Sequence, residues 1–209
     1  MSAAFLHGFL LAFAIILPFG PQNTLILQQG LRSASWRPIL PIVLTAGLSD
    51  TLLIIAAVAG ASTIVRHFPW IQDLLSLIGL IFLIVLGIHT WNTVPINPLE
   101  TPAVSGSLRQ KIRHSLSTSL LNPHAISDTL LVIGGNAAAY DLSHRQWAFA
   151  AGAISVSWLW FSILSVTGRL LQRLPHPLSI QRIMNRGSAL LMWLVALQFA
   201  YLLAHSLIR

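Results

Sequence analysis

The chain contains no cysteine and very little charge. Because none of its 209 residues is a cysteine, disulfide bridges, thiolate metal sites and dithiol electron transfer are excluded. Only 8% of the residues are charged and 55% are hydrophobic, and the mean hydropathy is +0.76. A soluble domain carries about 25% charged residues. The composition therefore predicts an integral membrane protein.

The sequence also lacks the short motifs of several enzyme classes. It has no metal-ligand spacing, no phosphate-cradling glycine loop and no nucleophile elbow. We therefore expect no catalytic residue, no metal and no cofactor, and any solute must move on a gradient because the chain has no ATP site. The start, MSAAFLHGF, has neither a basic n-region nor a small-residue cleavage site. We expect this first apolar segment to be retained.

Long apolar stretches make up most of the chain. Crossing a hydrocarbon core of roughly 30 Å takes about 20 apolar residues in a helix. Six stretches qualify: 3–31, 39–63, 70–91, 115–139, 146–168 and 186–207. Little is left over, so the sequence predicts a single all-α membrane domain, 1–209, with six transmembrane helices.

One long polar connector divides these stretches into two groups. Residues 92–113 are rich in proline, serine and charge, which is typical of a linker. Half one is then 1–91 and half two is 114–209, with three spans in each. An odd number of spans inverts the second half relative to the first. This is the inverted-repeat arrangement of many secondary transporters.

The positive charge is concentrated in alternate connections. Of the twelve Lys and Arg residues, nine follow the first, third and fifth stretches: Arg32, Arg37, Arg109, Lys111, Arg113, Arg169, Arg173, Arg182 and Arg186. The positive-inside rule places these connections and the linker in the cytoplasm and both termini outside. If 3–31 instead forms a re-entrant hairpin, five full spans remain and the N-terminus is cytoplasmic.

The first span of each half carries a helix break. Pro18-Phe19-Gly20-Pro21 interrupts the first stretch, and Asn122-Pro123 interrupts the fourth. Proline removes a backbone donor and clashes with the preceding turn. A new helix can restart with Pro21 at its first position, or with Asn122 as N-cap before Pro123. We therefore expect both of these helices to be discontinuous.

Two aspartates lie inside the apolar stretches. Asp50 belongs to the second stretch and Asp128 to the fourth. A carboxylate at mid-membrane costs about 2.5–3.5 kcal/mol even on lenient insertion scales, and such groups usually mark substrate or proton paths. His124 precedes Asp128 by four residues and shares its helix face. This spacing permits a proton relay, although a capping or packing role for His124 is equally open.

The breaks and the aspartates together predict a binding site. A half-helix that starts in the membrane directs free N–H groups and a positive dipole end at its surroundings, which suits an anionic group such as a carboxylate. The aspartates suit a cationic group or exchangeable protons. The predicted substrate-binding residues are Gly20, Pro21, Gln22, Asn23, Asp50, Asn122, Pro123, His124 and Asp128. We assign Asn136 and Asn185 to helix–helix hydrogen bonds and His7 to the membrane interface.

These motifs resemble a known family. LPFGPQN (17–23), LQQGLR (27–32), LSD (48–50), LLNPH with Asp128 (120–128) and QRIMNRGSALLMWLVALQFA (181–200) are similar to the lysine/arginine exporter (LysE) family, above all its arginine-exporter branch. The resemblance covers roughly residues 5–202. It implies a multi-pass exporter of basic amino acids, arginine and also lysine, in the bacterial inner membrane. It also implies that the membrane potential or a proton gradient drives export, and that Gly20, Pro21, Gln22, Asn23, Asp50, Asn122, Pro123 and Asp128 lie at or near the transport path.

Two other functions stay open. A related family that exports neutral amino acids such as threonine and homoserine shares this architecture. An intramembrane aspartyl protease would use two carboxylates as a proton-sharing dyad, but the chain has no tyrosine before Asp50 and no GxGD around Asp128. The expected partners are an amino-acid substrate, protons as coupling ion, membrane lipid and, through small-residue pairs such as Gly8/Ala12, a second copy of the chain.

Overall fold

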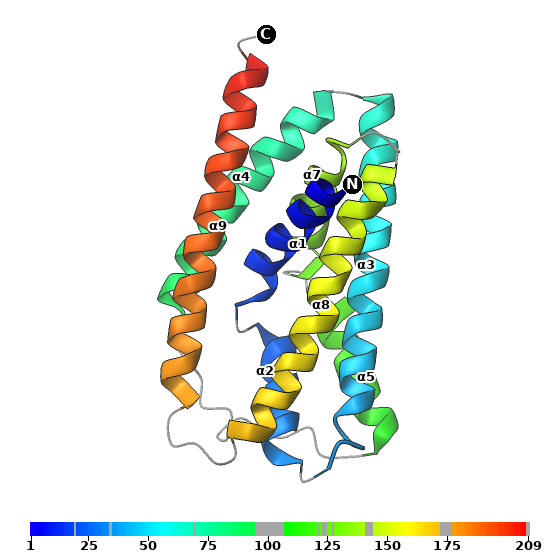
Figure 1. Ribbon diagram of the computed structural model, residues 1–209, viewed down its shortest axis with the longest axis vertical. Coiled ribbons are helices and arrows are strands. Elements are labelled where there is room, and N and C mark those ends of the chain that lie inside the picture. The colour runs from blue at the N-terminus through cyan, green and yellow to red at the C-terminus, as the bar shows by residue number, and fades with distance from the viewer. Residues whose placement is uncertain are drawn as a thin grey trace.

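A computed structural model describes residues 1–18, 20–33, 35–68, 70–94, 107–120, 122, 125–126, 128–140, 144–171 and 177–207. Every regular element in these ranges is a helix, so the all-α prediction is confirmed for them. In chain order (Figure 1) the helices are α1 (Ser2–Ile16), α2 (Pro21–Arg32), α3 (Leu40–His67), α4 (Trp70–Asn92), α5 (Leu108–Leu120), η1 (Asp128–Gly134), α7 (Gly135–Ala137), α8 (His144–Leu171) and α9 (Pro177–Leu207).

Several helices are long and apolar enough to cross a membrane. Within the described residues, Leu40–Gly60 of α3 and His144–Leu170 of α8 qualify alone, and the pair α1 and α2 qualifies together with a 76° bend between its members. The apolar part of α4, Leu77–Asn92, is shorter. The chain is therefore a multi-pass membrane protein. The described helices supply two or three spans by this measure, and the count of six stays a prediction.

The PFGP break lies where the sequence predicts it. Helix α1 ends at Ile16, and α2 restarts with Pro21 at its first position and Gly20 as N-cap in an extended conformation (ψ 178°). The carbonyl oxygen of Gly20 accepts the first bond of α2, from the N–H of Thr24 at 3.0 Å. Phe19 lies outside the described residues. The first stretch is thus two helices and not one.

The second break separates α5 from η1. The N–H of Ile126 donates to the carbonyl oxygen of Asn122 at 3.1 Å, so a helical turn restarts at Asn122 as an N-cap there requires. Pro123 lies outside the described residues. Beyond the break, η1 is a π-helix, which the sequence did not predict. Such wide turns are rare and occur frequently at functional sites.

A helix begins inside the predicted linker. Helix α5 begins at Leu108, so the last residues of 92–113 are helical. Ser107 and Gln110 explain this start: the N–H of Ser107 donates to Gln110 Oε1 at 2.8 Å, and the N–H of Gln110 donates to Ser107 Oγ at 3.4 Å. This reciprocal pair is a capping box. Residues 95–106 lie outside the described part of the chain.

Helices α1 and α2 both pack along α8. A side chain added at Gly8 would overlap the carbonyl oxygen of Phe149, and one at Gly152 would overlap that of Phe5. Further along the chain, Gly30 of α2 and Gly168 of α8 face each other, and the two helices cross closely there as well. Residues without side chains let helix backbones approach closely. The α1–α2 pair therefore follows α8 in the same direction over most of its length.

The remaining helices complete the bundle. Helix α3 packs against α5, η1 and α8, and α4 packs against α9. In Figure 1 the C-terminal ends of α2 and α8 and the N-terminal ends of α5 and α9 gather at the lower end of the molecule. Those ends carry most of the basic residues that the sequence assigns to the cytoplasm. The start of α1 and the end of α9 lie toward the opposite end, in agreement with the predicted sidedness.

Candidate functional site

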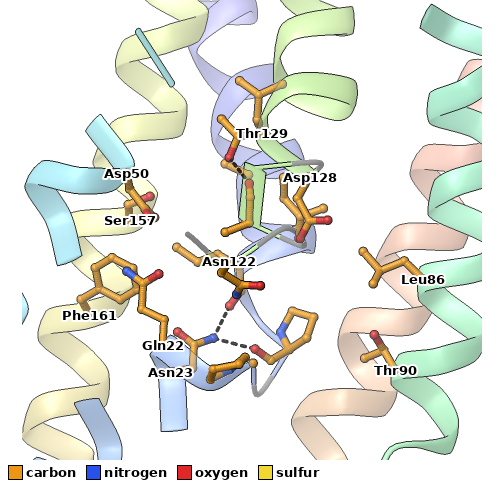
Figure 2. Close-up of a pocket in the computed structure, with 18 of the residues that line it drawn as sticks. Gln22, Asn23, Asp50, Leu86, Thr90, Asn122, Asp128, Thr129, Ser157 and Phe161 are labelled. Atoms are coloured by element: carbon orange, nitrogen blue, oxygen red, sulfur yellow. Dashed lines mark hydrogen bonds between the residues drawn. The ribbon is translucent and has the colours of Figure 1, made fainter. Parts of the chain in front are cut away.

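A cavity of about 280 Å³ lies where the two breaks meet α3, α4, α8 and α9 (Figure 2). Its apolar walls come from α1, α3, α4, η1 and α8. Its polar walls come from both breaks and from single residues on the long helices. The complete lining is Ala12, Ile15, Ile16, Pro18, Gly20, Pro21, Gln22, Asn23, Asp50, Ile54, Leu86, His89, Thr90, Thr93, Asn122, Ala125, Asp128, Thr129, Ile133, Ser157, Phe161 and Asn185.

Most of the predicted site residues share this cavity. Seven of the nine line it, namely Gly20, Pro21, Gln22, Asn23, Asp50, Asn122 and Asp128. The other two, Pro123 and His124, lie outside the described residues. Residues from both halves of the chain therefore converge on one space. Their role as substrate ligands stays a prediction.

Asp50 is held on the wall formed by α3 and α8. Its carboxyl group has the Ser157 hydroxyl and the Gln22 side-chain amide as polar neighbours. Figure 2 shows Asp50 beside Ser157, with Gln22 and Phe161 on the same side of the cavity. Asp50 is half-buried and Ser157 is fully buried. A cation that binds Asp50 would thus also meet the hydroxyl group of Ser157.

Asp128 occupies a different wall. It is the first residue of η1, and Figure 2 shows its side chain on the side of the cavity that faces Leu86 and Thr90 of α4. Its Oδ1 atom is buried and accepts no hydrogen bond from any residue that the structure describes. A buried carboxylate oxygen without a donor is costly. This oxygen is therefore available to a cationic ligand in the cavity.

The N-terminal end of α2 offers the opposite charge. No side chain caps this end, so the N–H groups of its first turn are available and the positive end of the helix dipole faces the cavity. Gln22 is only 9% exposed, and its Nε2 atom finds no acceptor within the described part of the chain. The helix end and Gln22 together can bind an anion such as a carboxylate.

Asn23 has a structural task that the sequence did not reveal. Its Nδ2 atom donates to the carbonyl oxygens of Ile16 and Pro18, both at 2.6 Å. Both amide hydrogens are thus engaged by the end of α1 and the segment that follows it. Asn23 ties the two parts of the broken helix together, and only its oxygen remains for other partners.

The sequence did not predict several of the residues that line the cavity. Ser157 and Phe161 of α8 and Thr90 of α4 line the cavity, but such residues are ordinary in membrane helices and gave no signal. Asn185, which we assigned to helix packing, is buried and also lines the cavity. Asn136 is also buried, but its Nδ2 donates to the carbonyl oxygen of Val132, four residues earlier in the same helical run, at 2.7 Å, so this bond does not join two packed helices.

His7, which we expect at the membrane interface, has partners from distant parts of the chain. His7 is half-buried, its Nδ1 atom lies 2.8 Å from the hydroxyl oxygen of Tyr140, and its ring meets the ring of Phe149 edge-on at 5.3 Å. Its neighbours come from α8 and from the segment after α7, so distant parts of the chain enclose it. Position near a span end could not show this.

Comparisons with known proteins agree with one another. The profile of the family described as LysE type translocator matches residues 13–203. Bacillus subtilis (strain 168) YisU, which carries a provisional amino-acid transporter name, is 41% identical over 194 residues, or 92% of this chain and 87% of that protein. The arginine exporter protein ArgO of Enterobacter sp. (strain 638) is 34% identical over 203 residues, or 96% and 94% of the two chains. That of Escherichia coli O157:H7 is 33% identical over 204 residues with the same coverage. No solved structure matches the chain.

Proposed function

The chain belongs to the LysE type translocator family, as its motifs predicted, and we propose that it exports basic L-amino acids, arginine above all and also lysine, from the bacterial cytoplasm. The observation that carries this proposal is the single cavity that holds two carboxylates and an uncapped helix end. An arginine zwitterion has one carboxylate and two cationic groups. The cavity offers a partner for each of them.

The helix packing supports an inverted repeat with six spans. The broken segment of half one, α1 and α2, packs on α8 of half two, and the broken segment of half two, α5 and η1, packs on α3 of half one. The equivalent helices of the two halves also pair, α3 with α8 and α4 with α9. A pseudo-two-fold axis between inverted halves produces this exchange. Rocking of one half against the other would then expose the cavity to alternate sides.

The course of the first two helices supports a full crossing. A re-entrant hairpin would return to the side from which it started. Instead, Gly8 of α1 lies near the start of α8, and Gly30 of α2 lies near its end. The pair therefore advances along α8 as a broken span does. Both termini would then lie on the non-cytoplasmic side of the inner membrane, and the basic end of the bundle would lie in the cytoplasm.

Export of a cation needs an energy source. Moving one positive charge outward against a negative-inside potential costs about 2.3 kcal/mol per 100 mV. A steep outward gradient of arginine or exchange for entering protons can supply this. The carboxyl groups of Asp50 and Asp128 and the imidazole of His89 line the cavity and could carry such protons when no substrate is bound.

Two alternatives are less well supported. An aspartyl protease needs carboxylates that share a proton, whereas Asp50 and Asp128 occupy different walls of the cavity (Figure 2), and the family is one of translocators. A neutral amino acid has no second cationic group to bind the second carboxylate, whose Oδ1 lacks a donor among the described residues. Transport measurements with arginine, lysine and threonine separate the two transporter classes.

The test is counterflow of radiolabelled arginine into proteoliposomes that contain the purified chain. We expect excess internal arginine or lysine to drive uptake of the label and internal threonine to drive little. A pH gradient with a more acidic exterior should accelerate outward movement if protons are exchanged. Absence of arginine counterflow in vesicles that carry out threonine counterflow would reject the proposed substrate.

A further inference from the structure

We propose that the two aspartates bind different cationic groups of the substrate: Asp50 binds the α-ammonium group and Asp128 binds the side-chain cation, so that Asp128 determines the preference for basic over neutral amino acids. This assignment rests on the proposed amino-acid export and goes beyond it. It divides the cavity into a backbone subsite, formed by Gln22, Asp50 and Ser157, and a side-chain subsite around Asp128.

The backbone subsite follows from the neighbours of Asp50. In every α-amino acid the carboxylate and the ammonium group are bonded to the same carbon atom, so their partners in the protein must lie close together. The Gln22 amide belongs to the uncapped first turn of α2 and is also a polar neighbour of the Asp50 carboxyl. An anion site and a cation site therefore adjoin at this wall. Ser157, beside Asp50, adds a hydroxyl group for the same ammonium group.

Asp128 does not have these neighbours. Its carboxyl lies toward α4, across the cavity from Asp50 (Figure 2). Its buried Oδ1 atom has no hydrogen-bond donor among them. A carboxylate separated from the anion site suits the far end of a long substrate. The guanidinium of arginine or the ammonium of lysine is such an end.

Apolar side chains on both sides of the cavity suit the aliphatic part of the substrate. Phe161 lies on the Asp50 side and Leu86 on the Asp128 side, and both line the cavity. Apolar side chains at these positions can cover methylene groups that join the two ends of arginine or lysine. Thr90 of α4, on the same side of the cavity as Leu86, can accept a further hydrogen bond from a guanidinium, which has five N–H donors.

The charge on Asp128 then makes the site prefer basic amino acids to neutral ones. A neutral side chain in this subsite leaves a buried carboxylate unpaired, and sites with unpaired polar groups reject such substrates strongly. Citrulline is the sharpest probe, because it replaces the guanidinium of arginine with a neutral urea group of nearly the same shape. Asn at position 128 presents an amide to that urea and has no charge to leave unpaired.

The experiment compares arginine and citrulline counterflow in proteoliposomes for the wild-type chain, Asp128→Asn and Asp50→Asn. We expect Asp128→Asn to shift the citrulline-to-arginine ratio of transport efficiency by roughly 100-fold or more toward citrulline, while retaining citrulline transport. We expect Asp50→Asn to lose both substrates together, because both have an α-ammonium group. Asp128→Glu, which keeps the charge, should keep the arginine preference.

Each result has a defined meaning. Equal loss of both substrates in a monodisperse Asp128→Asn protein, or a selective loss of arginine in Asp50→Asn, would overturn the assignment. Thermal unfolding of each variant in detergent, compared with wild type, separates loss of fold from loss of binding. If the wild-type chain transports neither arginine nor lysine, the proposed function fails instead, and it fails independently of the variants.

Discussion

The side-chain nitrogen of Asn23 lies 2.6 Å from the carbonyl oxygen of Ile16 and 2.6 Å from that of Pro18. These carbonyl groups belong to the end of α1 and the turn after it, where a helix leaves its last carbonyls without intrahelical donors. The side chain of Asn23 in α2 therefore donates hydrogen bonds to carbonyl groups that the break leaves without backbone donors. These two hydrogen bonds hold the start of α2 against the end of α1, beside the packing of both helices on α8.

The first prediction concerns these two hydrogen bonds of Asn23. Replacing Asn23 with Asp removes both donors and brings a carboxylate against two carbonyl oxygens. We expect a loss of about 2–4 kcal/mol in unfolding free energy and a large loss of arginine counterflow. Thermal unfolding in detergent, followed by circular dichroism, measures the first effect.

The matched control is Asn92→Asp. Asn92 lies exposed on α4, and its Nδ2 donates to the carbonyl oxygen of Ile88 at 2.9 Å. The same chemical change there should cost little, because water replaces the lost bond. If both variants unfold at the same temperature, Asn23 does not have the structural role described.

The second prediction concerns the crossing of α1 and α8. Gly8→Ala would place a methyl group against the carbonyl oxygen of Phe149, and overpacking of this kind costs about 1–3 kcal/mol. We expect a lower unfolding temperature and lower yield from the membrane. Gly60→Ala is the control, because nothing lies within 4 Å of a side chain at that position. A Gly8→Ala protein as stable as Gly60→Ala would contradict the close crossing.

The third prediction concerns Ser157. Its hydroxyl is a polar neighbour of the Asp50 carboxyl, and hydrogen bonds to charged groups contribute about 1.5–3 kcal/mol. We expect Ser157→Ala to raise the arginine concentration for half-maximal counterflow by roughly tenfold. Ser155→Ala on the same helix should have no effect, because Ser155 is exposed and donates to the carbonyl oxygen of Ala151. Identical kinetics for the two variants would exclude the role of Ser157 at Asp50.

The fourth prediction concerns the anion site at α2. Agmatine is arginine without its carboxylate. We expect Gln22→Ala to weaken arginine binding by roughly tenfold and to leave inhibition by agmatine nearly unchanged, because the Gln22 amide is proposed to contact the carboxylate. Competition assays in proteoliposomes measure both affinities. An equal loss for the two ligands would place the Gln22 contact elsewhere on the substrate.

The elements that the sequence predicted are those with a strong local signal. Proline and glycine in an apolar run fix the end of α1 and the start of α2, since a proline cannot accept an interior helix position without cost. Asp50 and Asp128 are conspicuous because a carboxylate in a membrane segment is costly. These signals depend on a residue and its immediate neighbours. They could therefore be identified without knowledge of the packing.

The elements that were missed depend on the packing of distant helices. Ser157, Thr90 and Asn185 become cavity residues because α8, α4 and α9 happen to turn those faces toward the breaks. Small polar residues are common in membrane helices, so the chain itself does not distinguish them. The contact of His7 with Tyr140 was missed for the same reason, since Tyr140 is 133 positions away in the sequence.

The π-helix at Asp128–Gly134 also sets the direction of its first side chain. A π turn accommodates one residue more than an α turn. A deletion of Leu131 should therefore favour ordinary α-helical winding, and it would rotate Asp128 relative to the rest of η1.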